Sequence, residues 1–265
     1  AASELGHQEE SKAYQDQLSQ IKAAFVSEFM TPNGRLISET QTAYVLALHF
    51  NLIPETLIPR AVDRLVENIK SYGNHLTTGF LGTPYLCHVL SENGRADVAI
   101  DLLLQKSYPS WLYPVTQGAT TIWERWDGLK PDGTTQTPSM NSYNHYAYGA
   151  IGEWMYRQLL GIQIDEKHAG FKHFFLKPIF PKEFDEVKGS YESLYGKIGV
   201  HWKQNDDNLT LSVEIPANTS ATLELPNEVG TWSKAIDNNR NLKFTSVTQN
   251  QQQLGSGKYV FRKEK

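Results

Sequence analysis

The sequence lacks several features that would each indicate a class of function. Its one cysteine, Cys87, excludes an intramolecular disulfide and a cysteine-cluster metal site. Lys and Arg number 25 against 29 Asp and Glu, so the formal net charge is −4 and no basic surplus exists to neutralise nucleic-acid phosphates. No apolar run approaches the roughly 20 residues that cross a bilayer. With 40% hydrophobic and 20% charged residues, the composition is that of a globular protein, and we expect neither nucleic acid nor a membrane as partner.

Common catalytic and metal-binding signatures are also missing. There is no His-Glu-x-x-His, no Gly-x-Ser-x-Gly and no set of carboxylates in calcium-loop spacing. Residues 74–84 contain two glycines but lack the Gly-Lys-Ser/Thr ending of a phosphate-binding loop, so we interpret them as a structural loop. Cys87 lies in an apolar stretch and is expected to be buried. We therefore expect no metal and no other cofactor.

The amino terminus is polar from Ala1 to Glu10 and has neither an initiator methionine nor the apolar core of a secretory signal. A cut from a longer parent or processing would explain both facts. The residues themselves give no compartment. A periplasmic or extracytoplasmic location in a bacterium is an expectation only.

Helical periodicity dominates up to about residue 165. An apolar stripe begins at Tyr14, and Ser38 with Gln41 resembles a capping box. Further helices are expected over about 56–72, over 83–93 after a Thr-Pro cap, over 95–106, and from Ser142 to just before Gly161. Between them, Tyr108–Met140 is a long loop with three tryptophans, and such loops are usually functional.

After residue 165 the apolar period becomes two, which is typical of half-buried strands. We expect strands near residues 187–194, 197–203, 209–215, 221–225, 242–248 and 258–262. The predicted fold class is therefore α+β in two parts: a helical array over residues 1–165 and an antiparallel β-sandwich over residues 166–265.

Two segments carry candidate chemistry. In residues 118–128, Glu124 stands between Trp123 and Trp126, and indole faces stack on sugar rings while a carboxylate can move a proton. The alternative is that Glu124 pairs with an arginine such as Arg125 and that both tryptophans belong to the core.

The second segment, residues 140–149, offers the neutral hydrogen-bonding groups of Asn144, His145 and their neighbours, which suit a hydroxyl-rich ligand. In the alternative reading, Asn141 or Ser142 only caps a helix and His145 is a core histidine with its hydrogen bonds satisfied.

Four stretches of this sequence resemble one known family. HLTTGFLGTPYL (75–86), GATTIWERWDG (118–128), MNSYNHYAYGAIGEWMY (140–156) and the supporting TQTAYVLAL (40–48) are similar to the carboxy-terminal half of the catalytic domain of bacterial α-L-rhamnosidases, glycoside hydrolase family 78. The motifs are long and specific, and the resemblance extends over about residues 30–205.

The resemblance implies a fold, a reaction and roles for particular residues. The family's catalytic domain is an (α/α)6 barrel that removes terminal α-L-rhamnose with inversion, so the ligand would be a rhamnose-containing oligosaccharide or glycoside. Glu124 inherits the role of general base and His145 that of a sugar contact. Trp123, Trp126 and Asn144 are expected to line the same pocket.

One departure from the family limits what the chain does alone. The family's general acid lies upstream in an acidic motif that this sequence does not contain, and only about six of twelve barrel helices are expected here. We therefore expect an inactive chain that needs a missing amino-terminal half or forms a homodimer. Two rivals remain: a barrel phosphorylase, for which no basic phosphate pocket is found, and a non-catalytic sugar-binding or assembly module.

Overall fold

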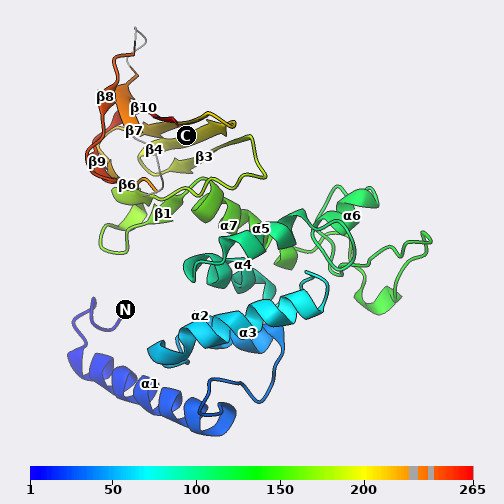
Figure 1. Ribbon diagram of the computed structural model, residues 1–265. Helices are drawn as coiled ribbons and strands as arrows, with labels where there is room; N and C mark the ends of the chain where they lie inside the picture. Colours follow the sequence, from blue (N-terminus) through cyan, green and yellow to red (C-terminus); the bar gives the residue numbers. More distant parts are fainter. Residues whose placement is uncertain (227–231, 238–241, 265) are drawn as a thin grey trace. The chain divides into compact units, whose positions relative to one another are not determined.

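The computed structural model describes residues 1–226, 232–237 and 242–264 (Figure 1). The chain forms two compact units, Ala1–Ile151 and Gly152–Lys265. The first is helical and the second is built of largely antiparallel sheets, which confirms the predicted fold class. Strand β1 begins at Ile162, and the boundary at residue 165 stays a prediction.

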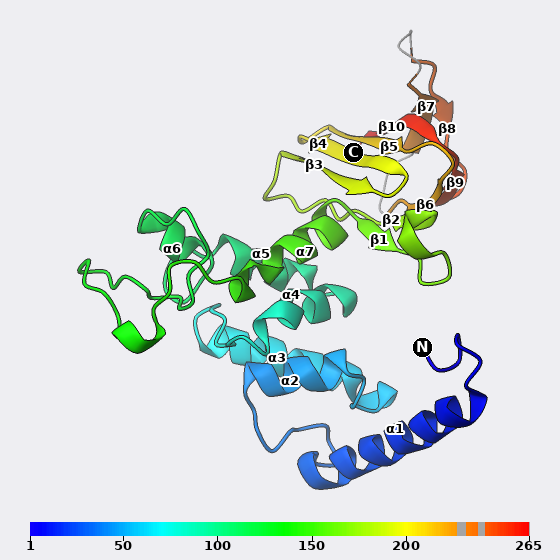
Figure 2. The same cartoon turned by 180° about the vertical axis from the view of Figure 1, so that it is seen from behind.

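The helical unit contains six α-helices and three short 3-10 turns within the described residues. Helix α2 packs on α3 and α4, and α4 packs on α5, so the middle of the unit is a stack of helices that Figures 1 and 2 show from opposite sides. The elements are α1 Gln8–Phe29, α2 Gln41–His49, η1 Glu55–Leu57, α3 Ile58–Ser71, α4 Thr83–Glu92, α5 Ala96–Leu104, α6 Leu112–Thr116, η2 Pro138–Met140 and η3 Ala147–Ala150.

The helix starts differ from the sequence prediction in two places. Helix α2 is capped by Thr40, whose hydroxyl accepts the Ala43 amide at 3.2 Å, rather than by Ser38. Helix α4 follows Gly82, a position that needs glycine because a Cβ there would lie 2.8 Å from the Thr42 hydroxyl oxygen. Thr83 lies inside the helix, where its hydroxyl bonds that of Thr78 at 2.8 Å and so fixes the preceding loop.

Helix α1 stands apart from this stack. None of its residues is buried, and four members of its apolar stripe are at least 47% exposed: Tyr14, Leu18, Ile21 and Phe29. An amphipathic helix with its apolar face in solvent normally has a partner for that face.

The second unit begins with a short helical segment and continues as two stacked sheets. The segment is α7 Ile151–Trp154, which starts at the last residue of the first unit, followed by the π-turn Met155–Leu159. The four-stranded sheet has the order β1-β2-β6-β9 and the six-stranded sheet the order β3-β4-β5-β10-β7-β8. Strands β2 and β6 are parallel, and the other described pairs are antiparallel.

The strands alternate between a shared core and solvent. The buried side chains of both sheets form one cluster with Phe174, Trp202, Leu211 and Phe261 among its members. Trp202 also donates its indole N–H to the Leu159 carbonyl at 2.7 Å. The strands are β1 Ile162–Ile164, β2 His173–Leu176, β3 Glu186–Ser193, β4 Gly196–Gln204, β5 Asn208–Ile215, β6 Ser220–Glu224, β7 Trp232–Ile236, β8 Thr245–Ser246, β9 Gln251–Leu254 and β10 Gly257–Glu264.

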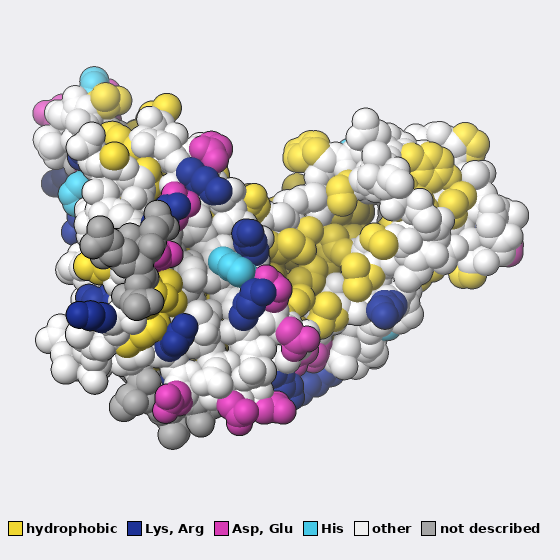
Figure 3. Space-filling view, turned by 90° about the horizontal axis from the view of Figure 1, so that it is seen from above, with side chains coloured by type: hydrophobic (Ala, Val, Ile, Leu, Met, Phe, Trp, Pro, Cys, Tyr) yellow, Lys and Arg dark blue, Asp and Glu magenta, His cyan; other side chains and the backbone are white. Residues whose placement is uncertain are grey.

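Charged side chains of both signs are interspersed on the face of the sandwich seen in Figure 3. Several form cross-strand ion pairs, such as Lys258 with Glu214 at 3.2 Å and His201 with Glu186 at 2.6 Å. None of the described helices is long and apolar enough to cross a membrane.

Candidate active site

Two chain segments from the conspicuous motifs lie side by side in the helical unit. The Glu124 amide donates to the Ser142 carbonyl at 2.9 Å, and the His145 amide donates to the Ile122 carbonyl at 2.8 Å. The Thr121 hydroxyl also donates to the carbonyl of Tyr143. This backbone pairing places Glu124 and His145 on adjacent chain segments, although they are 21 positions apart in the sequence.

The same pairing corrects the predicted last helix. The structure has no helix over residues 142–146, and the carbonyls of Ser142 and Tyr143 accept from Glu124 and Thr121 instead of from the next helical turn. Regular helical turns begin only at Ala147, and His145 precedes the helix rather than lying on it. The predicted start near Ser142 was therefore wrong.

The Glu124 carboxylate is held at one oxygen. Its Oε2 accepts the Ser142 amide at 2.8 Å, and the side chain is half-buried. Arg125 does not pair with it but binds Asp127, with 3.1 Å between Nε and Oδ1. Among the described residues no ion pair includes Glu124. One oxygen is thus fixed by a backbone donor while the other is left for a ligand or a water.

His145 is oriented by an aromatic ring and a backbone amide. Its imidazole stacks on Phe80 at 4.7 Å between centroids and 16° between planes, and its Nδ1 accepts the Ala147 amide at 3.3 Å. A neutral ring that accepts at Nδ1 carries its proton on Nε2. Nε2 is therefore the nitrogen that can donate to a sugar hydroxyl.

The two tryptophans beside Glu124 are packed into the protein. Trp126 is 9% exposed and stacks on Tyr148 at 3.7 Å, and Trp123 is 5% exposed and meets the edge of Tyr143 at 5.1 Å. This burial agrees with the alternative in which the indoles belong to the core. Their role as sugar-stacking residues stays a prediction. Burial raises the pKa of Tyr148 to about 12, so its phenol is neutral at physiological pH.

Asn144 lies between Tyr143 and His145, which both pair with the 121–124 segment, and its side chain is exposed. Its backbone amide donates to the Ser142 hydroxyl at 3.2 Å. This fixes the backbone of the turn and leaves the side-chain amide in solvent. Its role in sugar binding stays a prediction.

Sequence reasoning missed the contribution of the loop over residues 74–82. Phe80 in this loop supports His145 and also contacts Tyr148 at 5.4 Å. The buried Gln41 anchors the loop at two points, donating to the His75 carbonyl at 3.0 Å and accepting the Thr77 amide at 2.8 Å. The sequence shows Phe80 between Gly79 and Gly82, which could have indicated a functional aromatic residue, but only the fold shows that Phe80 contacts His145.

Neither nearby aspartate suits the role of general acid. Both carboxylate oxygens of Asp127 are already engaged, Oδ1 by Arg125 and Oδ2 by Gln136, so neither is free to face a leaving group. Hydrogen bonds from Thr134 lower the pKa of Asp132, whereas an acid catalyst needs a raised one. Within the described part of the chain, no group of three or more His, Cys, Asp or Glu side chains is arranged to hold a metal.

Comparison with known proteins identifies both units. Residues 1–159 match the bacterial α-L-rhamnosidase 6 hairpin glycosidase domain, and residues 161–238 match the bacterial α-L-rhamnosidase C-terminal domain. An α-L-rhamnosidase of Streptomyces avermitilis is 43% identical over 225 residues, and one of Formosa agariphila is 40% identical over 236. These matches cover 85% and 88% of this chain.

The fold agrees with a solved relative. The crystal structure of the Streptomyces avermitilis α-L-rhamnosidase complexed with L-rhamnose superposes with a TM-score of 0.86 at 38% identity, over 98% of this chain. The chain spans 22% and 25% of the length of the two curated relatives and 25% of that crystallised chain. The resemblance found in the motifs is thereby confirmed, and the chain belongs to the bacterial α-L-rhamnosidase family, with part of its six-hairpin glycosidase domain followed by its C-terminal domain.

Proposed function

We propose that this chain supplies the general-base side of an inverting α-L-rhamnosidase site, with Glu124 activating the water and His145 binding the sugar. The observation that carries the proposal is the placement of Glu124: Ser142 holds one carboxylate oxygen, and backbone pairing sets the residue beside His145. A base so held can take a proton from water with the second oxygen while its orientation is maintained.

Inversion requires a second carboxyl group on the other side of the sugar. The acid and the base of an inverting glycosidase are about 6.5–9.5 Å apart, which leaves room for the attacking water. Asp127 and Asp132 do not supply this acid, for the reasons given above. Since the chain spans only about a quarter of its relatives' length, we infer that the acid comes from a part of the six-hairpin domain that this chain does not include.

The test is a chimera in which this chain replaces the matching segment of the Streptomyces avermitilis α-L-rhamnosidase, called here the completed enzyme. We expect it to hydrolyse an aryl α-L-rhamnoside and to release rhamnose of inverted anomeric configuration, observed by proton NMR immediately after mixing. Retention of configuration would contradict the assignment of a base.

His145→Ala in the completed enzyme should act mainly on binding. Losing the Nε2 donor should raise KM about tenfold, which corresponds to about 1.4 kcal/mol, and should lower kcat as well because the sugar is held less firmly. Steady-state kinetics on the aryl rhamnoside measure both constants. His145→Gln, which keeps a donor, should recover part of the KM, and an unchanged KM in His145→Ala would refute the assigned role.

The apolar stripe of α1 supports the need for a partner. Because Leu18 and Ile21 are about half exposed on a helix that buries no residue, we expect the isolated chain to self-associate at high concentration. Leu18→Glu with Ile21→Lys should leave a monomer by sedimentation velocity. Gln20→Lys, on a different face of α1, is the control. If the unmodified chain is monomeric at its highest soluble concentration, the apolar face of α1 does not mediate self-association.

A sugar-binding or assembly module remains the second candidate, favoured because neither aspartate near Glu124 in the described part of the chain suits the role of acid. It predicts that the completed enzyme is inactive but still binds L-rhamnose in isothermal titration. Turnover by the completed enzyme decides between the two functions.

A further inference from the structure

The outer face of the four-stranded sheet carries a pocket of about 610 Å³ that is lined mainly by polar residue types. Its sheet residues point away from the core, since their neighbours along each strand, such as Phe174, Ala221 and Leu254, are buried. They bring together an imidazole, hydroxyls, amides and one aromatic ring from three adjacent strands. These residues are His173, Phe175, Ser220, Thr222, Gln251 and Gln253.

Four of these side chains form a hydrogen-bonded relay whose direction can be derived. Thr222 donates its hydroxyl proton to the Gln253 carbonyl oxygen at 3.0 Å. Thr222 must then accept from Nε2 of His173, 3.0 Å away. A neutral imidazole protonated at Nε2 accepts at Nδ1, so the Ser220 hydroxyl, at 2.8 Å, donates to it.

The relay leaves a fixed donor at one end and a fixed acceptor at the other. The Gln253 amide nitrogen keeps two N–H donors on an exposed side chain, and the Ser220 oxygen keeps lone pairs once its proton is committed. Phe175 lies next to His173, with 5.7 Å between ring centroids. The Lys177 ammonium lies over one face of the Phe175 ring, 4.7 Å from its centroid, and the opposite face adds an apolar surface. Donor, acceptor and aromatic ring together match the alternating hydroxyls and apolar patches of a sugar.

Two charged side chains that line the pocket, Asp165 and Lys172, each have a hydrogen-bond partner within the protein, which leaves the neutral relay to recognise a ligand. Asp165 pairs with His168 at 2.7 Å, and Lys172 donates to the Asn218 carbonyl at 2.5 Å.

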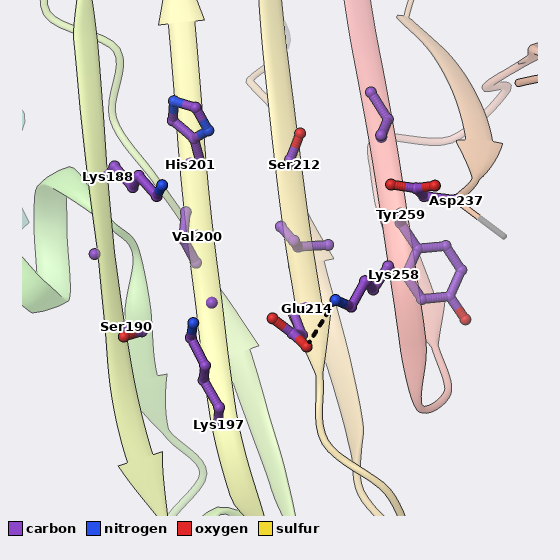
Figure 4. Close-up of a pocket in the computed structure, with 14 residues that line it drawn as sticks. Lys188, Ser190, Lys197, Val200, His201, Ser212, Glu214, Asp237, Lys258 and Tyr259 are labelled. Carbon is purple, nitrogen blue, oxygen red and sulfur yellow. Dashed lines mark ion pairs between the residues drawn. The ribbon is translucent and has the colours of Figure 1, made fainter. Parts of the chain in front are cut away.

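The opposite outer face of the sandwich is different in kind (Figure 4). His201 and Ser212 face each other there in register on β4 and β5, but His201 is bound to the carboxylate of Glu186, and Lys258 pairs with Glu214 across the pocket. That face also places a histidine beside a serine, but its pocket is lined by charged residues such as Lys188, Lys197 and Asp237 and has no glutamine or threonine among its described lining residues.

We propose that the outer face of the four-stranded sheet is a carbohydrate-binding site, distinct from the Glu124 site, that takes a rhamnosyl residue. Vicinal hydroxyls of the sugar bridge Ser220 and Gln253, and the methyl group of the 6-deoxy sugar lies on Phe175. The choice of rhamnose rests on family membership, whereas the site rests on the relay. A second site on the same chain would raise the local concentration of a polymeric substrate.

The experiment is isothermal titration of the 265-residue chain with methyl α-L-rhamnopyranoside, in a His145→Ala background that weakens the first site. We expect saturable binding that His173→Ala with Ser220→Ala weakens about tenfold. The matched control is His201→Ala with Ser212→Ala on the other face, which should leave Kd within twofold. Gln253→Ala, at an exposed position, should also weaken binding and does not depend on how the double variant folds.

Binding that survives both the double variant and Gln253→Ala would overturn the proposal. So would the absence of any binding in the His145→Ala background while the unmodified chain binds, since the sugar would then occupy only the Glu124 site. No binding by either chain also overturns it. The proposed function is tested separately, by turnover of the completed enzyme, and can stand in each of these cases.

Discussion

Glu124→Gln in the completed enzyme should lower kcat by about 10²–10⁴, the range that one general base contributes. The amide has the shape of the carboxylate and can still accept the Ser142 amide through its carbonyl oxygen, so the local structure is preserved. It cannot take a proton from water. KM should therefore change little while turnover is lost.

Steady-state kinetics with an aryl rhamnoside measure this effect. Asp132→Asn provides the matched control because it removes a carboxylate from the same long loop, where Asp132 is exposed and bonded only locally to Thr134. We expect the control to retain activity within twofold. If Glu124→Gln keeps most of the parental kcat, another group is the base.

The 265-residue chain alone should have no measurable rhamnosidase activity. The general acid is expected to contribute about 10²–10⁴-fold by itself, and we expect the rest of the sugar pocket to be supplied from outside this chain as well. The activity of the chain should therefore fall at least about 10⁴-fold below that of the completed enzyme.

Assays at matched concentration, with the completed enzyme as positive control, test this expectation. Robust hydrolysis by the chain alone would mean that a second carboxylate acts within it. Asp127→Asn and Asp132→Asn would then be the first variants to examine.

Periodicity predicted the elements whose stability comes from a regular apolar face. Helices α3 and α5 and strands β4 and β5 all lie close to their expected bounds, since each repeats its buried positions at the period of its own structure. Strand β9 was missed because its sequence, Gln-Gln-Gln-Leu, has no alternation, and β1 because it has three residues. The strand expected over 242–248 is reduced to β8, Thr245–Ser246.

The candidate site was harder to predict because long-range backbone pairing builds it. The motifs identified Glu124 and His145 through resemblance, but nothing local in the sequence shows that the Ser142 amide holds Glu124 or that residues 142–145 are not helical. Nor does periodicity reveal that Phe80 stacks on His145. Contacts between distant segments depend on how the helices pack on one another, and the sequence of a single helix does not show that packing.

Chemical rescue of Glu124→Ala in the completed enzyme tests the central claim most directly. Azide needs no deprotonation, so it can replace the activated water in the space that the missing carboxylate leaves. Its nitrogen bonds to the anomeric carbon as the leaving oxygen departs from the other face and takes the proton of the general acid. We predict that Glu124→Ala is nearly inactive in buffer and that added azide restores turnover, with β-L-rhamnosyl azide as the product seen by proton NMR. Hydrolysis to rhamnose at the parental rate without azide would contradict the assignment of Glu124 as the base.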